Sequence, residues 1–358
     1  MVLAYSLNRR SFLKSLSATA AGFVASQADW HQVFAQQVVN LNGAGATFPA
    51  PIYQTWAQEF GKLNPNIQVN YQSVGSGAGR RQFVARTVDF GASDSVPRPE
   101  EIAQVEGEAQ PPKGMVSIPM VAGALVAAYN IPGVNSEIRL SRQVLANIFL
   151  GKLNRWNDPL ITALNPRVTF PNLPITVVHR SDGSGTTEIF TNHLNAISTE
   201  WQQRVGRGSS VNWPTGVGAR GNEGVSEQIK QIPGSIGYVE FGFAKLNNLA
   251  VARLENRAGK FVTPTVESEQ AGLSQIQLNE RLLGIDPDPI GEESYPIVGY
   301  TWILAYKTYA NAQTSQALKE FLRYALSDGQ AFAEPLGYVP LPAEVLQKSL
   351  AAVETITP

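Results

Sequence analysis

Cysteine is absent from the 358-residue chain, which excludes disulfides, thiolate metal sites and a lipid-bearing cysteine. Charged residues are also few, at 16%, and the net charge is −1. The chain therefore lacks the positive field with which nucleic-acid-binding proteins attract their ligand. No run approaches the roughly 20 apolar residues that span a bilayer.

Histidine is scarce, with three in the chain, of which His179 and His193 follow residue 35. His193 falls on the apolar stripe of a predicted helix, which favours a core position, and His179 alternates away from its neighbour Arg180 on a predicted strand. Ser184 lies in the sequence Asp182-Gly183-Ser184-Gly185, which lacks the leading glycine of a nucleophile elbow. The GxxxxGK[ST] phosphate loop is missing as well. We therefore expect no catalytic residue, no cofactor and no metal site.

The N-terminus has the pattern of an export signal. Arg9 and Arg10 precede a mildly apolar stretch from Leu16 to Ala25, and the triplet Val33-Phe34-Ala35 is typical of a cleavage site. We predict a twin-arginine signal over residues 1–35, with a short amphipathic helix as the alternative. Its removal changes the net charge from −1 to −3. The exported protein is expected to be soluble in the periplasm, without a membrane anchor.

Three segments share one pattern, in which an alternating or aliphatic run leads into a loop rich in Gly, Ser and Thr and then into helical periodicity. They are residues 38–63, 67–88 and 175–197. In the first, Pro49 and Pro51 open a helix with Ile52, Trp56, Phe60 and Leu63 on one face. Period 2, then glycine, then period 3.6 predicts βα units of a parallel sheet.

The rest of the chain also reads as α/β material. An apolar run covers 116–131, a glycine-containing strand covers 235–239, and residues 255–295 have the composition of a polar connection with some helix. The length favours two domains.

The three glycine-rich loops are candidate anion sites. A helix N-terminus offers unpaired backbone N–H groups and partial positive charge, and glycine lets the backbone approach a ligand closely. One such loop is weak evidence, but ligands of open α/β sheets collect at the carboxyl ends of strands, so three loops favour one shared site.

Two charged residues adjoin the third loop. Arg180 ends the predicted strand, where a planar guanidinium could hold a tetrahedral oxyanion through two hydrogen bonds. Asp182 follows and is placed to orient it. The alternatives are a surface ion pair for Arg180 and a helix cap for Asp182.

Asp94 is an unusual residue to find near an anion. An ionised carboxylate only accepts hydrogen bonds, so it repels a fully deprotonated anion and accepts a bond from one that carries a proton. This property distinguishes hydrogen phosphate from sulfate. Capping of a helix at 97–103 is the alternative role for Asp94.

Five ordered motifs carry a resemblance to a known family. The chain resembles the phosphate-binding subunit of high-affinity phosphate ABC transporters from about residue 40 to about 340. The motifs are Gly43 to Pro51, Asn70 to Gly77, Val88 to Asp94, Arg180 to Thr186, and Gly221 to Val225, with Pro233 to Glu240 in addition. His179 and Ser181 depart from the family pattern, which commonly has a basic and a small apolar residue there.

The resemblance implies a type II periplasmic binding protein of two α/β domains, each a mainly parallel sheet flanked by helices, with the ligand in the cleft between them. By similarity, domain I comprises residues 36–119 and 296–358 and domain II residues 120–295, with crossings near Pro119 and Pro296. The implied contacts with hydrogen phosphate are Thr47, Phe48, Ser76, Asp94, Arg180, Ser184, Gly185 and Thr186, with Asp182 supporting Arg180. The implied partners are inorganic phosphate and the permease subunits of an ABC importer, and we expect a monomer.

Three other functions remain open on the sequence. A receptor for sulfate or molybdate is opposed by Asp94, and a secreted phosphatase lacks a visible nucleophile or metal site. A scaffold protein that has lost its ligand is opposed by the retained site residues.

Overall fold

Two long strands, β4 (Lys113–Asn130) and β12 (Val298–Thr308), run antiparallel through the middle of the main sheet. β4 is buried along almost its whole length, as expected for an apolar run covered on both faces. The computed structural model describes residues 38–134 and 136–358, so the predicted export signal lies outside the described residues.

The main sheet has nine strands in the described part of the chain. Its order is β2-β1-β3-β12-β4-β8-β6-β7, with β9 paired to β4. The other strands are β1 (Val39–Gly45), β2 (Ile67–Ser73), β3 (Phe90–Ser93), β6 (Thr176–Arg180), β7 (Val217–Ala219), β8 (Ser235–Glu240) and β9 (Ala250–Val251). Strands pair in parallel at both ends of this order, and the pairs that involve β4 or β12 are antiparallel. The predicted mixed α/β architecture is confirmed.

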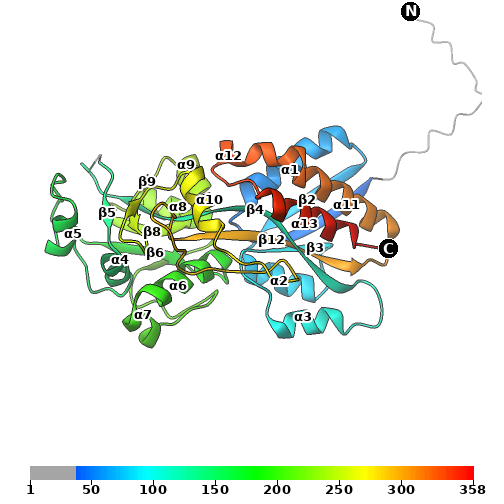
Figure 1. The fold of residues 1–358 in the computed structure, drawn as a ribbon, viewed down its shortest axis with the longest axis horizontal. Helices are drawn as coiled ribbons and strands as arrows, with labels where there is room; N and C mark the ends of the chain where they lie inside the picture. The colour runs from blue at the N-terminus through cyan, green and yellow to red at the C-terminus, as the bar shows by residue number, and fades with distance from the viewer. Residues whose placement is uncertain (1–37, 135) are drawn as a thin grey trace, which may run out of the picture. The chain divides into compact units, whose positions relative to one another are not determined.

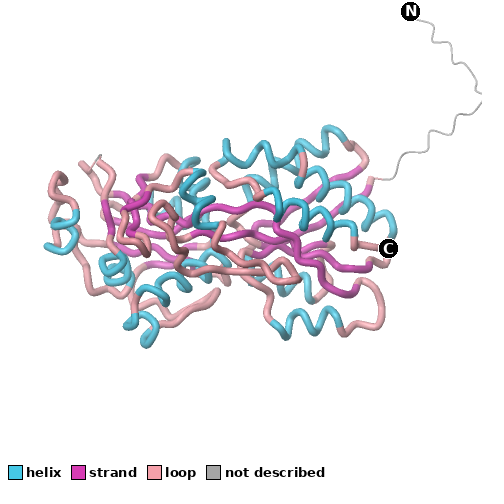
Figure 2. The backbone as a smooth tube through the Cα atoms, in the orientation of Figure 1, coloured by secondary structure: helices cyan, strands magenta, loops and turns pink. Residues whose placement is uncertain are grey.

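Helices cover both faces of the sheet (Figures 1 and 2). Those packed on the half that contains β1 to β3 are α1 (Ala50–Leu63), α2 (Ser76–Val84), α3 (Pro99–Glu106), α11 (Ala312–Leu326) and α13 (Ala343–Glu354), with η1 (Asp328–Phe332) and α12 (Ala333–Leu336) beside them. Those on or near the other half are α4 (Arg142–Phe149), α5 (Pro159–Leu164), α6 (Gly185–Ile197), α7 (Thr199–Arg204), α8 (Gly221–Gln231), α9 (Phe241–Leu246) and α10 (Val266–Leu273).

The three predicted βα units are present as β1-α1, β2-α2 and β6-α6. In α1, Ile52, Trp56 and Phe60 are buried at helical spacing, as the sequence predicts. The assignment of Leu63 to that face is wrong, because its residue is 67% exposed. α1 ends at Leu63, where the chain turns toward β2.

Residues 255–295 are more structured than a polar connection. They contain part of β10 (Arg253–Glu255), then β11 (Phe261–Val262) and α10. β10 pairs with β11 and with β5 (Arg139–Leu140) in a separate three-stranded sheet. These strands are two or three residues long, too short to leave a periodic signal in the sequence.

The predicted domain boundaries stay a prediction. β12 pairs with β4 up to Ala124, and β8 continues the pairing from Leu125 to Asn130. Pro119 lies within β4, opposite a register shift between Thr301 and Trp302. Both long strands therefore pair within the half of the sheet that contains β3, and β4 continues into the other half.

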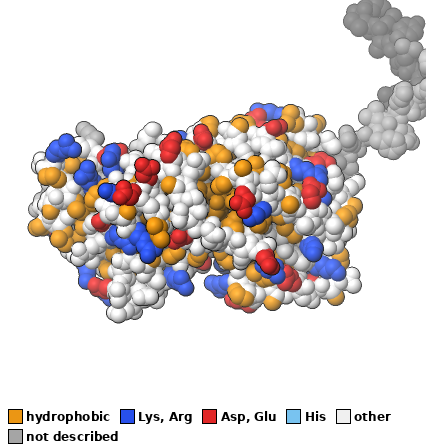
Figure 3. Space-filling view, in the orientation of Figure 1, with side chains coloured by type: hydrophobic (Ala, Val, Ile, Leu, Met, Phe, Trp, Pro, Cys, Tyr) orange, Lys and Arg blue, Asp and Glu red, His pale blue; other side chains and the backbone are white. Residues whose placement is uncertain are grey.

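The described surface is mixed in charge. Figure 3 shows acidic and basic side chains interspersed over the face in view, without an extended patch of one sign. Within residues 38–134 and 136–358, none of the helices has the length and apolar character needed to cross a membrane.

Candidate anion-binding site

The predicted site residues lie where strands of the main sheet end. Thr47 follows β1, Ser76 opens α2, Asp94 follows β3, and Arg180 is the last residue of β6. Ser184 caps α6, where its side chain accepts a hydrogen bond from the backbone N–H of Thr187 at 3.0 Å. The remaining predicted contacts are Phe48, two residues before α1, and Gly185 and Thr186, which open α6.

Asp94 is the hub of the cluster. Its Oδ2 accepts hydrogen bonds from the hydroxyls of Ser76, at 3.3 Å, and Thr186, at 3.4 Å. Its Oδ1 accepts one from the Thr301 hydroxyl at 3.0 Å. The helix cap next to this loop is Arg98, so the alternative role of Asp94 as a cap of that helix is wrong.

The charge of Asp94 is strongly affected by burial. The residue is 1% exposed, and burial raises the pKa of its carboxyl to about 7, against the opposing effects of the Thr301 hydroxyl and the Arg180 charge. A cavity of about 20 Å³ beside it is lined by Val298, Tyr300 and Trp302 among others. These surroundings therefore disfavour the charged form of the Asp94 carboxyl.

Arg180 is held from one side. Its Nε and Nη2 donate to Oδ1 and Oδ2 of Asp182 at 2.8 and 2.6 Å. Burial alone would raise the pKa of Asp182, but the hydrogen bonds and charge of Arg180 hold it below its usual value. Arg180 is 3% exposed, and its Nη1 has no hydrogen-bond partner among the described residues. A buried donor of this kind is suited to an anion.

Glycine lets the loops approach each other. A Cβ on Gly185 would lie 2.6 Å from the Ser76 hydroxyl and 2.7 Å from the Asp94 Cβ. Gly77 donates its backbone N–H to the carbonyl of Gly183 at 2.8 Å. The loops after β2 and β6 therefore meet directly, and the site residues between them are buried.

Two residues of this cluster were not singled out in the sequence. Thr301 lies in β12, and Asn222 is the second residue of α8. Asn222 donates to the Thr47 hydroxyl oxygen twice, from its backbone N at 3.1 Å and from Nδ2 at 2.9 Å. Asn222 belongs to one of the resemblance motifs, which was the available signal, whereas Thr301 is brought in only by long-range strand pairing.

The remaining predicted contact, Phe48, is fixed by its carbonyl, which accepts the hydroxyl of Tyr338 at 2.8 Å. The two histidines lie where the sequence predicts. His193 is buried, with Nδ1 2.8 Å from the Pro287 carbonyl, and the ring of His179 stacks on Trp213 at 4.9 Å. In the described residues no group of three or more His, Cys, Asp or Glu side chains is placed to hold a metal ion.

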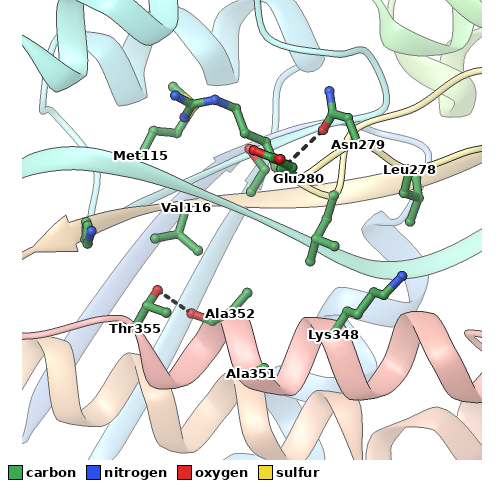
Figure 4. A pocket seen from close by; sticks show the side chains of 13 residues that line it. Met115, Val116, Leu278, Asn279, Glu280, Lys348, Ala351, Ala352 and Thr355 are labelled. Carbon is green, nitrogen blue, oxygen red and sulfur yellow. Dashed lines mark hydrogen bonds between the residues drawn. The ribbon is translucent and has the colours of Figure 1, made fainter.

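A separate groove of about 650 Å³ lies between β4, the segment 278–282 and α13 (Figure 4). Its apolar lining comes from Met115, Val116, Leu278 and Ala352. The Thr355 hydroxyl donates to the Ala352 carbonyl at 2.7 Å. None of the predicted anion contacts lines this groove.

Comparison with known proteins identifies the family of the chain. Residues 27–329 match the model of the PBP superfamily domain. The chain is 44% identical over 322 residues to the phosphate-binding protein PstS of Pasteurella multocida, covering 89% of this chain and 91% of that protein. The chain belongs to the PstS family of this superfamily.

PstS relatives extend well beyond one lineage. The phosphate-binding protein PstS of Methanocaldococcus jannaschii is 38% identical over 338 residues, with 88% of this chain and 86% of that protein covered. A solved structure of a high-affinity periplasmic phosphate-binding protein, PfluDING, with bound phosphate has a TM-score of 0.71 at 26% identity. The match covers 87% of this chain and 93% of the PfluDING chain. The two-domain periplasmic-binding-protein fold predicted from the sequence is therefore confirmed.

Proposed function

We propose that this chain is a receptor that binds inorganic phosphate, as hydrogen phosphate, and delivers it to an ABC importer. The observation that carries the proposal is the convergence of a buried carboxylate, Asp94, with a buried guanidinium that has a free donor, Arg180. An anion that carries both negative charge and a proton matches that pair. The names of the PstS relatives support the same ligand.

In this proposal the predicted contacts act as a charged donor, a proton acceptor and a set of neutral donors. Arg180 provides charge-assisted donors, with Asp182 orienting it, and Asp94 accepts the proton of the ligand. The neutral donors are the hydroxyls or backbone N–H groups of Thr47, Phe48, Ser76, Ser184, Gly185 and Thr186. Because the site residues are buried, each hydrogen bond acts in a low-dielectric environment, where it is stronger than in water.

The wider setting is also proposed. Residues 1–35 would direct export, and the protein would act in the periplasm as a soluble monomer that docks on permease subunits. Residues 36–119 with 296–358 would form one domain and 120–295 the other, and the two would close over the anion. The direct bond between Gly77 and Gly183 supports closure, because these residues belong to different proposed domains.

A binding role without catalysis fits the family, whose characterised members are named as binding proteins. The carboxyl of Asp94 is surrounded by the hydroxyl donors of Ser76, Thr186 and Thr301. These side chains can hold a tetrahedral oxyanion. The alternative functions are a receptor for another oxyanion and a phosphatase, and the following experiment distinguishes them.

Calorimetric titration of the protein purified from the periplasm, stripped of bound anion by reversible unfolding, tests the proposal. We expect one phosphate per chain with a Kd below about 1 µM and no heat from sulfate at the same concentration. Equal binding of sulfate would indicate a general oxyanion receptor, and no heat from either anion would refute the proposal. Release of product from a chromogenic phosphate monoester, with divalent metal added, would indicate a phosphatase.

A further inference from the structure

Asn222 uses all of its side-chain hydrogen-bonding groups inside the site. Its Oδ1 accepts the backbone N–H of Glu240 at 3.2 Å, which fixes the orientation of the amide. Its Nδ2 then faces two hydroxyl oxygens, Thr47 Oγ1 at 2.9 Å and Thr186 Oγ1 at 3.2 Å. All three of Asn222, Thr47 and Thr186 are buried.

These bonds determine the direction of the Thr47 hydroxyl. A hydroxyl oxygen has two lone pairs, and both lone pairs of Thr47 Oγ1 receive hydrogens from Asn222, one from the backbone N and one from Nδ2. The single hydroxyl hydrogen of Thr47 must then be donated. Among the described residues no group accepts this hydroxyl hydrogen, so the hydrogen is available to an anion in the site.

Thr186 is set in the same way. Its oxygen accepts from Asn222 Nδ2, and its hydrogen points to Asp94 Oδ2 at 3.4 Å. A Thr186 hydroxyl turned the other way would leave Asp94 with one donor fewer. Asn222 therefore influences both a donor to the anion and a donor to the carboxylate that receives the anion's proton.

The first turn of α8 supports the charged residues as well. Gly221 donates its backbone N–H to Asp182 Oδ1 at 3.1 Å, and Asp182 holds Arg180. The first two N–H groups of this 11-residue helix are thus used on residues that hold the site, and neither remains free for a ligand.

We propose that Asn222 is a positioning residue for anion binding, which makes the Thr47 hydroxyl an obligate donor and orients Thr186 toward Asp94. The proposal rests on the function proposed above. Thr47 and Asn222 are 175 residues apart and belong to different proposed domains, so their hydrogen bonds form when the domains close. Closure then allows Asn222 to orient the Thr47 and Thr186 hydroxyls for anion binding.

The test is a double-mutant cycle on phosphate affinity, with Asn222→Ala, Thr47→Val and the double variant. If Asn222 acts through Thr47, Asn222→Ala weakens binding by about 30-fold alone and by under about 5-fold in the Thr47→Val background. Equal losses in both backgrounds, or a loss under about threefold alone, would overturn the proposal. Wild-type protein that binds no phosphate would instead refute the proposed function.

Asn222→Asp supplies a second readout that a packing role would not move. The isosteric carboxylate removes both Nδ2 donors and attracts the Thr47 hydrogen away from the anion, but once protonated it regains one donor. Asn222 is buried, and burial raises the pKa of a carboxyl placed there, so the variant side chain takes up a proton at a higher pH than an exposed aspartate does. The ratio of variant to wild-type Kd should therefore fall by at least about tenfold between pH 8 and pH 5. A ratio that stays constant with pH would overturn the proposal.

Asn130→Ala is the matched control. Asn130 Nδ2 donates to the carbonyls of Ile229 and Lys230 at 3.0 Å each, so this residue holds the other end of α8. Its loss should lower the unfolding temperature and leave phosphate affinity within about twofold of wild type. An equal loss of affinity in Asn130→Ala would mean that α8 acts only as a packing element, against the proposal.

Discussion

Arg180 and Asp182 form a two-point ion pair, with Nε to Oδ1 at 2.8 Å and Nη2 to Oδ2 at 2.6 Å. The pairing occupies one edge of the guanidinium and leaves Nη1 unpartnered within residues 38–134 and 136–358. The backbone N–H of Arg180 donates to the Tyr238 hydroxyl at 3.1 Å. Protein groups alone therefore fix the orientation of Arg180, which lowers the entropy cost of binding an anion.

Substitution Arg180→Lys should weaken phosphate binding by about 100-fold, or ~3 kcal/mol, because an ammonium cannot hold Asp182 at two points and also reach the anion. Arg142→Lys is the matched control, since Arg142 also contacts a carboxylate at two points, with Nη1 and Nη2 each donating to Asp288 at 2.8 Å. Calorimetry should find the control's Kd unchanged. A similar loss in both variants would assign the effect to folding.

Asp94→Asn should reduce discrimination between phosphate and sulfate by at least about 100-fold at pH 7.5. The amide offers donors to a fully deprotonated anion, and it removes the charge that repels sulfate. Competition of sulfate against labelled phosphate measures the ratio. Asp89→Asn is the control, because Asp89 bonds the backbone N–H of Asn42 at 2.7 Å outside the site. Unaltered selectivity in Asp94→Asn would remove this residue from its proposed role.

His193 should make the fold sensitive to acid. Burial lowers the pKa of His193 to about 4, although the Pro287 carbonyl and Asp288 oppose the shift. As the pH falls from about 6.5 to about 4, the unfolded chain takes up a proton that the folded chain does not. The free energy of unfolding should therefore fall by about 3 kcal/mol over that interval, relative to a His193→Gln variant.

Urea unfolding of both proteins from pH 8 to pH 4 measures this difference. Above pH 7 the gap between wild type and His193→Gln should be constant, since His193 is neutral in both states there. A gap that is also constant below pH 6 would contradict the prediction.

Glu269 should make the fold less stable as the pH rises. Burial raises the pKa of this carboxyl to about 8, against the backbone N–H of Ala124 and the charge of Lys245. Between pH 4.5 and pH 8 the unfolded chain loses a proton that the folded chain keeps, so stability falls as the pH rises. Glu269→Gln should gain about 1.4 kcal/mol per pH unit over wild type in that interval.

The exposed Glu267, in the same helix, provides the control. Glu267→Gln should track wild type in urea unfolding at pH 5 and pH 8, whereas Glu269→Gln should diverge from it. Parallel behaviour of the two variants would show that Glu269 is ionised in the folded state.

Local patterns carried much of the prediction. Alternation followed by glycine and helical periodicity located β1-α1, β2-α2 and β6-α6, because these signals lie within about 25 consecutive residues. Thr47, Ser76 and Asp94 lie together for a related reason, since they follow the neighbouring parallel strands β1, β2 and β3. Arg180 and Thr186 follow β6, which lies in the other half of the sheet, and they join the cluster through long-range packing. Their roles as ligand contacts stay a prediction.

What the sequence could not supply is long-range. Thr301 donates a hydrogen bond to Asp94, 207 positions away in the sequence, because β12 pairs with β3 and β4. No local sequence pattern around Thr301 predicts that contact. The direction of the Thr47 hydroxyl depends on Asn222 in the same way. Leu63 fits the helical pattern, yet it is exposed because α1 ends there.

The path of β4 also has a genetic consequence. This strand pairs with β12 through Ala124 and with β8 from Leu125 onward, so one continuous segment belongs to both halves of the sheet. A recombination event that joined one half of this gene to a foreign other half would have to cut within β4 and again before β12.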